Sequence, residues 1–307
     1  MTRYLLRRLG GLVALLIGIS VLVFLMIRLI PGDPVTTILG QSASDPALVE
    51  RLRAQLGIDR PLYVQYLSWL RGVVVGDFGY SYSQQRPVTQ LIAVNIGPTV
   101  GLTVAALAVT VAVGLLLGVL AGIRRGTPLD TGIMGTALTF MSLPSFWLGS
   151  MLLVLFAVKL PIFDVVGGSG LSGLVLPTVT LALGGVGFLS RFVRSSVADT
   201  ARQKYVTTAR AKGLSNRAVV VGQVVRNALL PVLTVVGLQL GNLLSGTVIV
   251  ETVFSRPGIG RLLVDSILQK DYLTVQAVVL LIAAIYALVN TAVDLLYPIL
   301  DPRVAAR

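Results

Sequence analysis

Six stretches of the sequence contain no charged residue, and each is long enough for a helix to cross a lipid bilayer. A spanning helix needs about 20 mainly apolar residues, because the hydrocarbon core of a bilayer is about 30 Å thick. The stretches are residues 9–27, 87–123, 131–158, 165–190, 227–250 and 272–293. The sequence therefore predicts an all-α integral membrane protein with six transmembrane helices.

The amino-acid composition excludes an ordinary soluble globule and leaves little equipment for catalysis. Charged residues make up 12% of the chain, about half of the roughly 25% found in soluble domains. The chain has no histidine and no cysteine, which removes the usual general base, thiolate metal sites and Ser-His-Asp triads. None of its lysines follows a glycine, as a phosphate-binding loop requires. We therefore expect no reaction centre, no metal site and no ATP hydrolysis by this chain.

The distribution of basic residues predicts the orientation of the six helices, because cytoplasmic loops of membrane proteins carry an excess of Lys and Arg. If both termini are cytoplasmic, the cytoplasmic pieces hold 15 of the 25 basic residues and only 3 of the 13 acidic ones. This excess equals the whole net charge of +12. We therefore predict that both termini are cytoplasmic. Since topology explains the basic charge, a nucleic-acid partner is not expected.

Residues 31–97 form one long segment outside the membrane, after the first helix. A short amphipathic helix is predicted from Asp45–Pro46 to Gly57, and a second one begins at Pro61. The second helix carries the aromatic residues Tyr63, Tyr66 and Trp69. Because such side chains favour the membrane–water interface, we expect both helices to lie on the outer face of the bilayer. They either cap the helix bundle or form a rim for a delivery protein.

Small residues and prolines inside the predicted spans indicate close packing and kinks. The pairs Gly114–Gly118 and Gly237–Gly241 are each spaced by four, a pattern that lets membrane helices approach closely. Pro144 falls in the middle of the third span, and Pro177 lies near the start of the fourth. A proline inside a helix frees a carbonyl and bends the helix, so kinks are predicted at both positions.

Three charged residues lie near the ends of predicted spans, namely Arg28, Glu251 and Asp294. A charge at such a place either reaches towards water, pairs with another group or marks a transport pathway. Asn290 and Asp294 share one face of the sixth helix with Tyr297, which predicts an inward polar seam. The candidate pathway or gate residues are therefore Glu251, Asn290 and Asp294.

The loop between the fourth and fifth helices, residues 191–226, holds eight basic residues and one acidic residue. Tyr205 and Ala209 are spaced by four among these charges, and Gly213 supplies a helix stop. The pattern predicts a short basic helix that faces the cytoplasm, with Pro231 at the opening turn of the fifth span. Such a loop either only sets the topology or docks a cytoplasmic partner.

Several segments, in order along the chain, carry a family resemblance. They are PGDP at 31–34, GDFG at 76–79, YVTTARAKGL at 205–214, RNALLP at 226–231, VETVF at 250–254, PGIG at 257–260 and DLLY at 294–297. Together they resemble the permeases of ABC importers, and more narrowly the dipeptide and oligopeptide subfamily, over nearly the whole chain. The general importer signature has Glu where this chain has Thr207, and fewer residues between Gly213 and Pro231. This departure leaves open which residues contact the ATPase.

The resemblance implies that the chain is one half of a membrane channel that works by alternating access. A second, homologous permease would form the other half, and a substrate-binding protein outside the membrane would deliver the cargo. Two cytoplasmic ATPase subunits would hold ATP and Mg, so that this chain binds no cofactor. The implied docking residues are Arg202, Tyr205, Ala209, Arg210, Ala211, Lys212, Gly213 and Leu214.

The implied location is the cytoplasmic membrane of a bacterium or archaeon, and the implied cargo is di- or oligopeptides, with glutathione, sugars and nickel complexes as other cargoes of such systems. We expect one permease domain, residues 1–307, in which the first helix is 1–30, the outer segment is 31–97, and the five-helix core is 98–307 with its docking loop at 191–228. The alternative is an ion-coupled secondary transporter, which usually places ionisable groups near the bilayer midplane. The uncharged stretches offer none.

Overall fold

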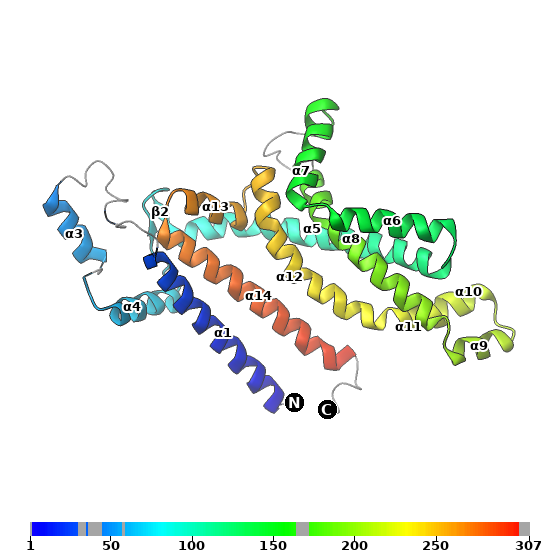
Figure 1. The fold of residues 1–307 in the computed structure, drawn as a ribbon. Coiled ribbons are helices and arrows are strands. Elements are labelled where there is room, and N and C mark those ends of the chain that lie inside the picture. The colour runs from blue at the N-terminus through cyan, green and yellow to red at the C-terminus, as the bar shows by residue number, and fades with distance from the viewer. Residues whose placement is uncertain (1, 30–34, 36–44, 57–58, 164–171, 301–307) are drawn as a thin grey trace. The chain divides into compact units, whose positions relative to one another are not determined.

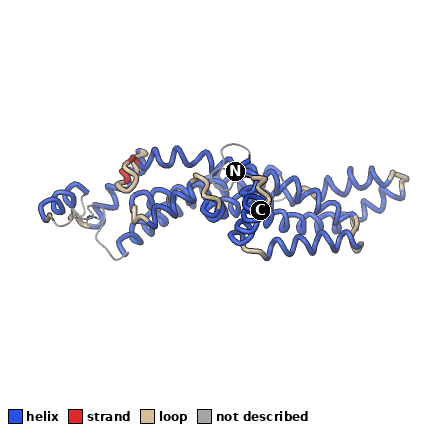
Figure 2. Tube along the Cα trace, turned by 90° about the horizontal axis from the view of Figure 1, so that it is seen from above, coloured by secondary structure: helices blue, strands red, loops and turns tan. Residues whose placement is uncertain are grey.

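The computed structural model describes residues 2–29, 35, 45–56, 59–163 and 172–300. Most of these residues are helical, and two short strands form an antiparallel pair (Figures 1 and 2). The elements are α1 (Thr2–Leu29), α3 (Pro46–Leu56), α4 (Leu62–Val75), β1 (Tyr80–Ser81), β2 (Arg86–Pro87), α5 (Val88–Ile123), α6 (Pro128–Ser142), α7 (Ser145–Leu153), η2 (Val154–Lys159), α8 (Ser172–Thr200), α9 (Lys204–Ala211), α10 (Asn216–Ala218), η3 (Val219–Val225), α11 (Arg226–Ala228), α12 (Leu230–Val253), α13 (Ile259–Leu268) and α14 (Tyr272–Leu300).

Four helices among the described residues are long and apolar enough to cross a membrane, namely α5, α8, α12 and the Tyr272–Val293 part of α14. A fifth candidate span is broken, because α6 and the helix that follows it meet at an angle of 100°. The apolar part of α1, Gly10–Met26, is shorter than these spans. The structure thus confirms a helical protein with four or five candidate spans, and the sixth span stays a prediction.

The break in the third predicted span lies at Pro144, where the sequence predicts a kink. Pro144 has extended backbone angles and directly precedes α7, so α6 ends at Ser142. The reason is steric, since the proline ring disfavours helical geometry in the residue before it. Pro177, in contrast, lies inside α8, and that helix continues through it.

The chain forms two compact units, each of which is described by itself. The first consists of residues 1–98 and 257–288, and the second of residues 99–256 and 289–307. The boundaries fall inside α5 and α14, so each unit contains part of both helices. The division into a first helix, an outer segment and a five-helix core remains a prediction.

In the first unit, an aromatic cluster joins α1 to α4. The ring of Phe24 lies 5.3 Å from that of Tyr66 and 5.9 Å from that of Trp69, between centroids. The Ser20 hydroxyl shares a hydrogen bond of 2.8 Å with the Tyr66 hydroxyl. Two of the three aromatic residues predicted for the membrane surface therefore pack against α1. At α3 the predicted start is confirmed, because Asp45 accepts a bond of 2.9 Å from the Ala47 backbone N–H.

Also in the first unit, a buried carboxylate ties the strand pair to the start of α14. The Asp271 carboxylate is buried and accepts hydrogen bonds from the hydroxyls of Ser81, Ser83 (2.9 Å) and Thr274 (2.8 Å). The Thr274 backbone N–H donates a further bond of 3.4 Å to the other oxygen. We call these four residues the Asp271 cluster. It fixes residues 81–83 to the turn that precedes α14.

In the second unit, α5 and α8 pack closely along a seam of glycines. A Cβ atom added to Gly118 would lie 2.5 Å from Val193 Cβ, and one added to Gly122 would lie 2.7 Å from Val197 Cβ. Gly114 faces Leu189 in the same way, one turn earlier. These distances confirm the packing role predicted for Gly114–Gly118. In the second predicted pair, Gly237–Gly241, a Cβ atom added to Gly237 would lie 2.7 Å from the Val293 side chain.

Candidate docking site and pathway residues

The predicted basic helix is present as α9, which runs from Lys204 to Ala211. The helix starts after Gln203, has its C-cap at Lys212, and is followed by Gly213 with a φ of +81°. Glycine adopts this left-handed conformation without the steric penalty that a side chain brings, so Gly213 ends the helix as predicted.

One face of α9 is anchored in an apolar cluster. Val206 is fully buried and Ala209 nearly so, in contact with a cluster that includes Val193 and Val197 of α8. Tyr205, four residues before Ala209, is 43% exposed and does not share this buried face. Val206 shares the inward face with Ala209 because residues three apart are neighbours on a helix. That apolar spacing of three was the signal available in the sequence.

The exposed residues of α9 and of the turns beside it carry basic and apolar side chains. Tyr205 and Leu214 are 43% and 47% exposed. The remaining residues of the predicted docking set that are exposed are Arg202, Arg210, Ala211, Lys212 and Gly213. A surface of this kind suits a partner that combines carboxylates with an apolar depression. The structure therefore gathers the predicted docking residues on one short helix and its ends, except that Ala209 faces inward.

Residues 191–228, which the sequence predicts to be a docking loop, are largely helical. Residues 191–200 are the last turns of α8, and Asp199, Arg191 and Arg194 lie on that helix. The charges therefore mark the end of the uncharged stretch without ending the helix. After α9 the chain continues through α10, the π-helical η3 and α11 into α12, which has Pro231 in its first turn, as predicted.

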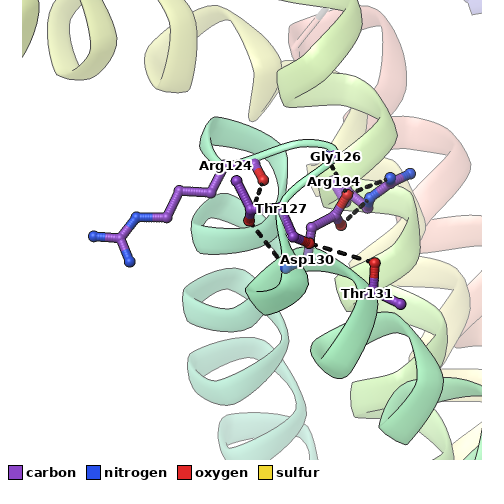
Figure 3. Close-up of polar contacts among 6 residues, drawn as sticks. All are labelled: Arg124, Gly126, Thr127, Asp130, Thr131 and Arg194. Carbon is purple, nitrogen blue, oxygen red and sulfur yellow. Dashed lines mark hydrogen bonds and ion pairs between the residues drawn. The ribbon is translucent and has the colours of Figure 1, made fainter.

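An ion pair links α8 to the first turn of α6 (Figure 3). Arg194 donates to both carboxylate oxygens of Asp130, from Nε at 2.5 Å and from Nη2 at 2.6 Å. The Gly126 backbone N–H donates a third bond of 2.9 Å to the same carboxylate. Thr127 caps α6 by accepting from the Asp130 N–H at 3.4 Å. Asp130 is buried, whereas the Arg194 side chain is 27% exposed.

The charge of this pair is stable near neutral pH. The hydrogen bonds from Arg194 lower the pKa of Asp130 from 3.8 to about 2; the Gly126 N–H acts in the same direction, and burial opposes both. Both side chains lie outside the uncharged stretches 131–158 and 165–190. The Asp130 carboxylate therefore stays ionised throughout the physiological pH range.

The candidate pathway residues lie in different settings. Glu251 is fully buried near the end of α12, and its carboxylate accepts a hydrogen bond of 2.6 Å from the Thr99 hydroxyl. The buried Thr99 hydroxyl is thus one partner of this charge, and the pathway or gate role of Glu251 stays a prediction. Asn290 is half-buried on α14. Asp294 and Tyr297 belong to the same helix, but their side chains lie outside the described residues.

Comparison with protein families gives two matches that together span almost the whole chain. Residues 114–306 match the family described as binding-protein-dependent transport system inner membrane component. Residues 1–103 match the N-terminal region described for the same kind of membrane component. The second match includes the outer segment, and the first includes α9.

Curated relatives align over the full length. The chain is 41% identical over 304 residues to the glutathione transport system permease protein GsiC of Salmonella typhimurium strain LT2, which covers 99% of both chains. It is 40% identical over 304 residues to the protein of the same name from Escherichia coli strain K12, again with 99% of both chains covered.

Solved structures show the same helical fold at low sequence identity. The MetNI methionine ABC transporter in inward-facing conformations matches with a TM-score of 0.59 and 18% identity, over 69% of this chain and 96% of that one. An amino acid ABC transporter with histidines matches with a TM-score of 0.54 and 17% identity, over 70% of this chain and 94% of that one. These likenesses concern the fold alone.

Proposed function

The chain belongs to the inner membrane components of binding-protein-dependent transport systems, and on that basis we propose that it forms half of the channel through which an ATP-driven importer moves peptides. The observation that carries the proposal is the full-length similarity to permeases named for glutathione transport. Glutathione is a modified tripeptide, so a pathway shaped for short peptides accounts for both the subfamily resemblance and this similarity. The cargo that we propose is di- and oligopeptides, with tripeptide-sized cargo included.

We propose six spans with both termini in the cytoplasm. Two contacts support this topology because each joins loops that the charge distribution assigns to the same side. The Ser81–Asp271 bond connects the segment after the first span with the turn before the last span, which are both assigned to the outside. The Asp130–Arg194 pair connects the first turn of α6 with the last turns of α8, which are both assigned to the cytoplasm.

In this proposal α9 is the element on which a cytoplasmic ATPase subunit docks. Its inward face is anchored by Val206 and Ala209, so a force applied to the outward face is passed to the helices behind it. Tyr205 on the helix and Leu214 just after it are exposed among basic side chains. ATP and Mg belong to the ATPase subunits, a second permease completes the channel, and the binding protein delivers cargo from outside.

Affinity purification tests the assembly. The tagged chain is extracted in mild detergent from cells that express it from its own locus, and its companions are identified by mass spectrometry while ATPase activity is assayed. We expect a second permease, P-loop ATPases and ATP turnover that rises with the binding protein. Recovery of the chain alone, with uptake in vesicles that is abolished by collapsing ion gradients but insensitive to ATP, would establish an ion-coupled transporter instead.

Competition assays test the cargo. Vesicles that contain the purified complex are loaded with ATP and supplied with the binding protein and a labelled dipeptide. We expect unlabelled di- and tripeptides, including glutathione, to compete, and free amino acids and sugars to be without effect. Competition by a sugar but by none of the peptides would contradict the peptide proposal and leave the importer assignment intact.

A further inference from the structure

We infer that the Asp130–Arg194 ion pair makes α6, the first half of the broken span, move together with the docking helix α9. Arg194 is in that case a positioning residue for the coupling of ATP hydrolysis to transport. The inference rests on the proposed function and deepens it, because it names side chains that carry motion from the docking site into a span. Four observations within the second unit lead to it.

First, one short stretch of α8 contacts α5 and shares an apolar cluster with the docking helix. Val193 and Val197 fill the spaces left by Gly118 and Gly122 of α5. The same valines belong to the apolar cluster that buries Val206 of α9. We call residues 193–197 the α8 hub.

Two polar side chains of the hub extend these contacts to the starts of two further helices. The Ser196 hydroxyl donates a bond of 2.7 Å to the Ala228 carbonyl, at the junction of α11 with α12. Arg194 reaches in another direction and holds Asp130, at the start of α6. A displacement of α9 that moves the hub is thereby passed on to both helices.

Second, the pair has the geometry of a rigid connection. The guanidinium of Arg194 is planar and binds both oxygens of Asp130, which fixes direction as well as distance. The Gly126 N–H holds the same carboxylate from its own side. The first turn of α6, where the helix would otherwise be free to fray, is therefore fastened to α8.

Third, α6 meets α8 at a second point on the same face. A Cβ atom added to Gly187 would lie 2.6 Å from the Ala137 carbonyl oxygen. Ala137 follows Asp130 by seven residues, and Gly187 precedes Arg194 by seven, so the two contacts are about two helical turns apart on antiparallel helices. Two contacts at that separation prevent α6 from pivoting on α8, and Figure 1 shows these helices side by side.

Fourth, the far end of α6 is the break at Pro144, where the span turns by 100°. A helix that is fastened at one end and broken at the other delivers its movement to the break. Discontinuous helices often form binding sites and gates in transporters because the break is where a span changes shape. Through α8 and α6, the ion pair thus connects the docking helix to the break at Pro144, where the span can change shape.

The test uses the complete importer, purified through this chain and reconstituted in vesicles with its binding protein. The variants are Arg194→Lys, Asp130→Asn and the reversed pair Asp130→Arg with Arg194→Asp. Arg191→Lys is the matched control, because Arg191 is an exposed arginine of the same helix that contacts only the Met141 sulfur, at 3.9 Å, among the contacts described for it. The readout is peptide transported per ATP hydrolysed, measured beside recovery of the ATPase subunits.

We expect Arg194→Lys and Asp130→Asn to lower transport per ATP about tenfold, the usual size of a coupling effect, with ATPase recovery and ATP turnover retained. The reversed pair restores part of the lost coupling, and Arg191→Lys has no effect. Unchanged transport per ATP in a recovered complex overturns the inference. If the unaltered complex shows no ATP-dependent uptake, the proposed function itself fails.

A spin-label distance measurement tests the inference in variants that no longer assemble with the ATPase subunits. The natural chain has no cysteine, so Leu129→Cys in the first turn of α6 and Gln203→Cys before α9 carry spin labels at two defined positions. Leu129 is exposed, and the Gln203 side chain makes no capping bond. We expect one narrow distance distribution in the unaltered background, with and without ATP, and a broad one in Arg194→Lys. Equal widths in both backgrounds overturn the inference.

Discussion

Asp130 and Asp271 are both buried carboxylates that fasten a turn to a helix, but one is held by a cation and the other by hydroxyl groups. Asp130 receives two bonds from the Arg194 guanidinium and one from a backbone N–H. The Asp271 cluster supplies three hydroxyl donors and one backbone N–H. In the part of the chain that the structure describes, no Lys or Arg forms an ion pair with Asp271.

The difference teaches what each kind of connection suits. A guanidinium fork fixes the direction of approach, and loss of either partner leaves a charge without compensation. Hydroxyl groups rotate about their own bonds and exchange donor and acceptor roles, so they tolerate small shifts. The Asp130–Arg194 pair, which fixes direction, lies close to the proposed docking helix, where motion has to be transmitted. The Asp271 cluster, which tolerates shifts, holds a short strand pair in the outer segment.

The largest loss of stability is expected from a substitution that displaces α8, the helix that carries Arg194. Gly118→Leu places a side chain where Val193 already lies, since even a Cβ would be 2.5 Å from Val193 Cβ. We expect destabilisation by at least about 3 kcal/mol, at the upper end of overpacking effects, measured as the loss of folded protein in detergent on heating. Gly101→Leu on the same helix is the control, because its added Cβ meets nothing within 4 Å; an equal loss would contradict the seam.

Removal of Asp130 is the next largest perturbation. Asp130→Ala leaves the Arg194 charge without its partner, and we expect a loss of about 3 kcal/mol, the lower end for a broken buried pair, because the Arg194 side chain is 27% exposed and reaches water. The measurement is unfolding in mixed micelles with increasing SDS. Adding Arg194→Met should recover much of the loss. If the double variant is no better than Asp130→Ala, the unpaired charge is not the cause.

Substitution by asparagine sharpens the contrast between the two sites. Asp271→Asn keeps a carbonyl oxygen for the serine and threonine hydroxyls, which reorient around the new amide, so we expect a loss of about 1 kcal/mol, the size of one hydrogen bond. Asp130→Asn turns an amide towards a guanidinium and loses the charge attraction, so it should cost about twice as much. The same unfolding assay compares the two variants, and equal losses would show that the partner's charge does not matter.

The smallest effect is expected from pH. The pKa of Asp130 falls from 3.8 to about 2 on folding, so its stabilisation is fully present above about pH 4 and is lost as the pH falls through 2. The stability difference between the natural chain and Asp130→Ala should therefore be the same at pH 8 and pH 5. If this stability difference were smaller at pH 5 than at pH 8, the pKa of Asp130 would have to lie well above 2, which would contradict the prediction.

The uncharged stretches were enough to locate α5, α8, α12 and α14, because the hydrocarbon thickness sets both the length and the polarity of a span. The helix break at Pro144 and the helix end at Gly213 were predictable from the sequence, because the backbone preferences of proline and glycine act locally. The position of α9 was predictable from its basic residues and from Gly213, but its buried face was not, because a helix of eight residues offers more than one plausible apolar face.

The ion pair was not predictable in the same way. Asp130 and Arg194 are separated by 64 residues, and each was explained in the sequence by the charge asymmetry of membrane topology. Nothing in a single sequence distinguishes an arginine that marks the cytoplasmic side from one that also binds a distant carboxylate. The same holds for Asp271, whose hydroxyl partners become recognisable only when the strand pair is seen to lie against the turn before α14.

The spacing of the partners in the two connections has a consequence for biosynthesis. Asp271 follows Ser81 by 190 residues, so at about 5–20 residues per second the ribosome adds it about 10–40 s later. Arg194 follows Asp130 by 64 residues, a delay of about 3–13 s at the same rate. The strand pair must therefore wait, unfastened, until nearly all of the chain has been made. Closure of the Asp271 cluster is therefore a late step, which a chain truncated before Asp271 cannot complete.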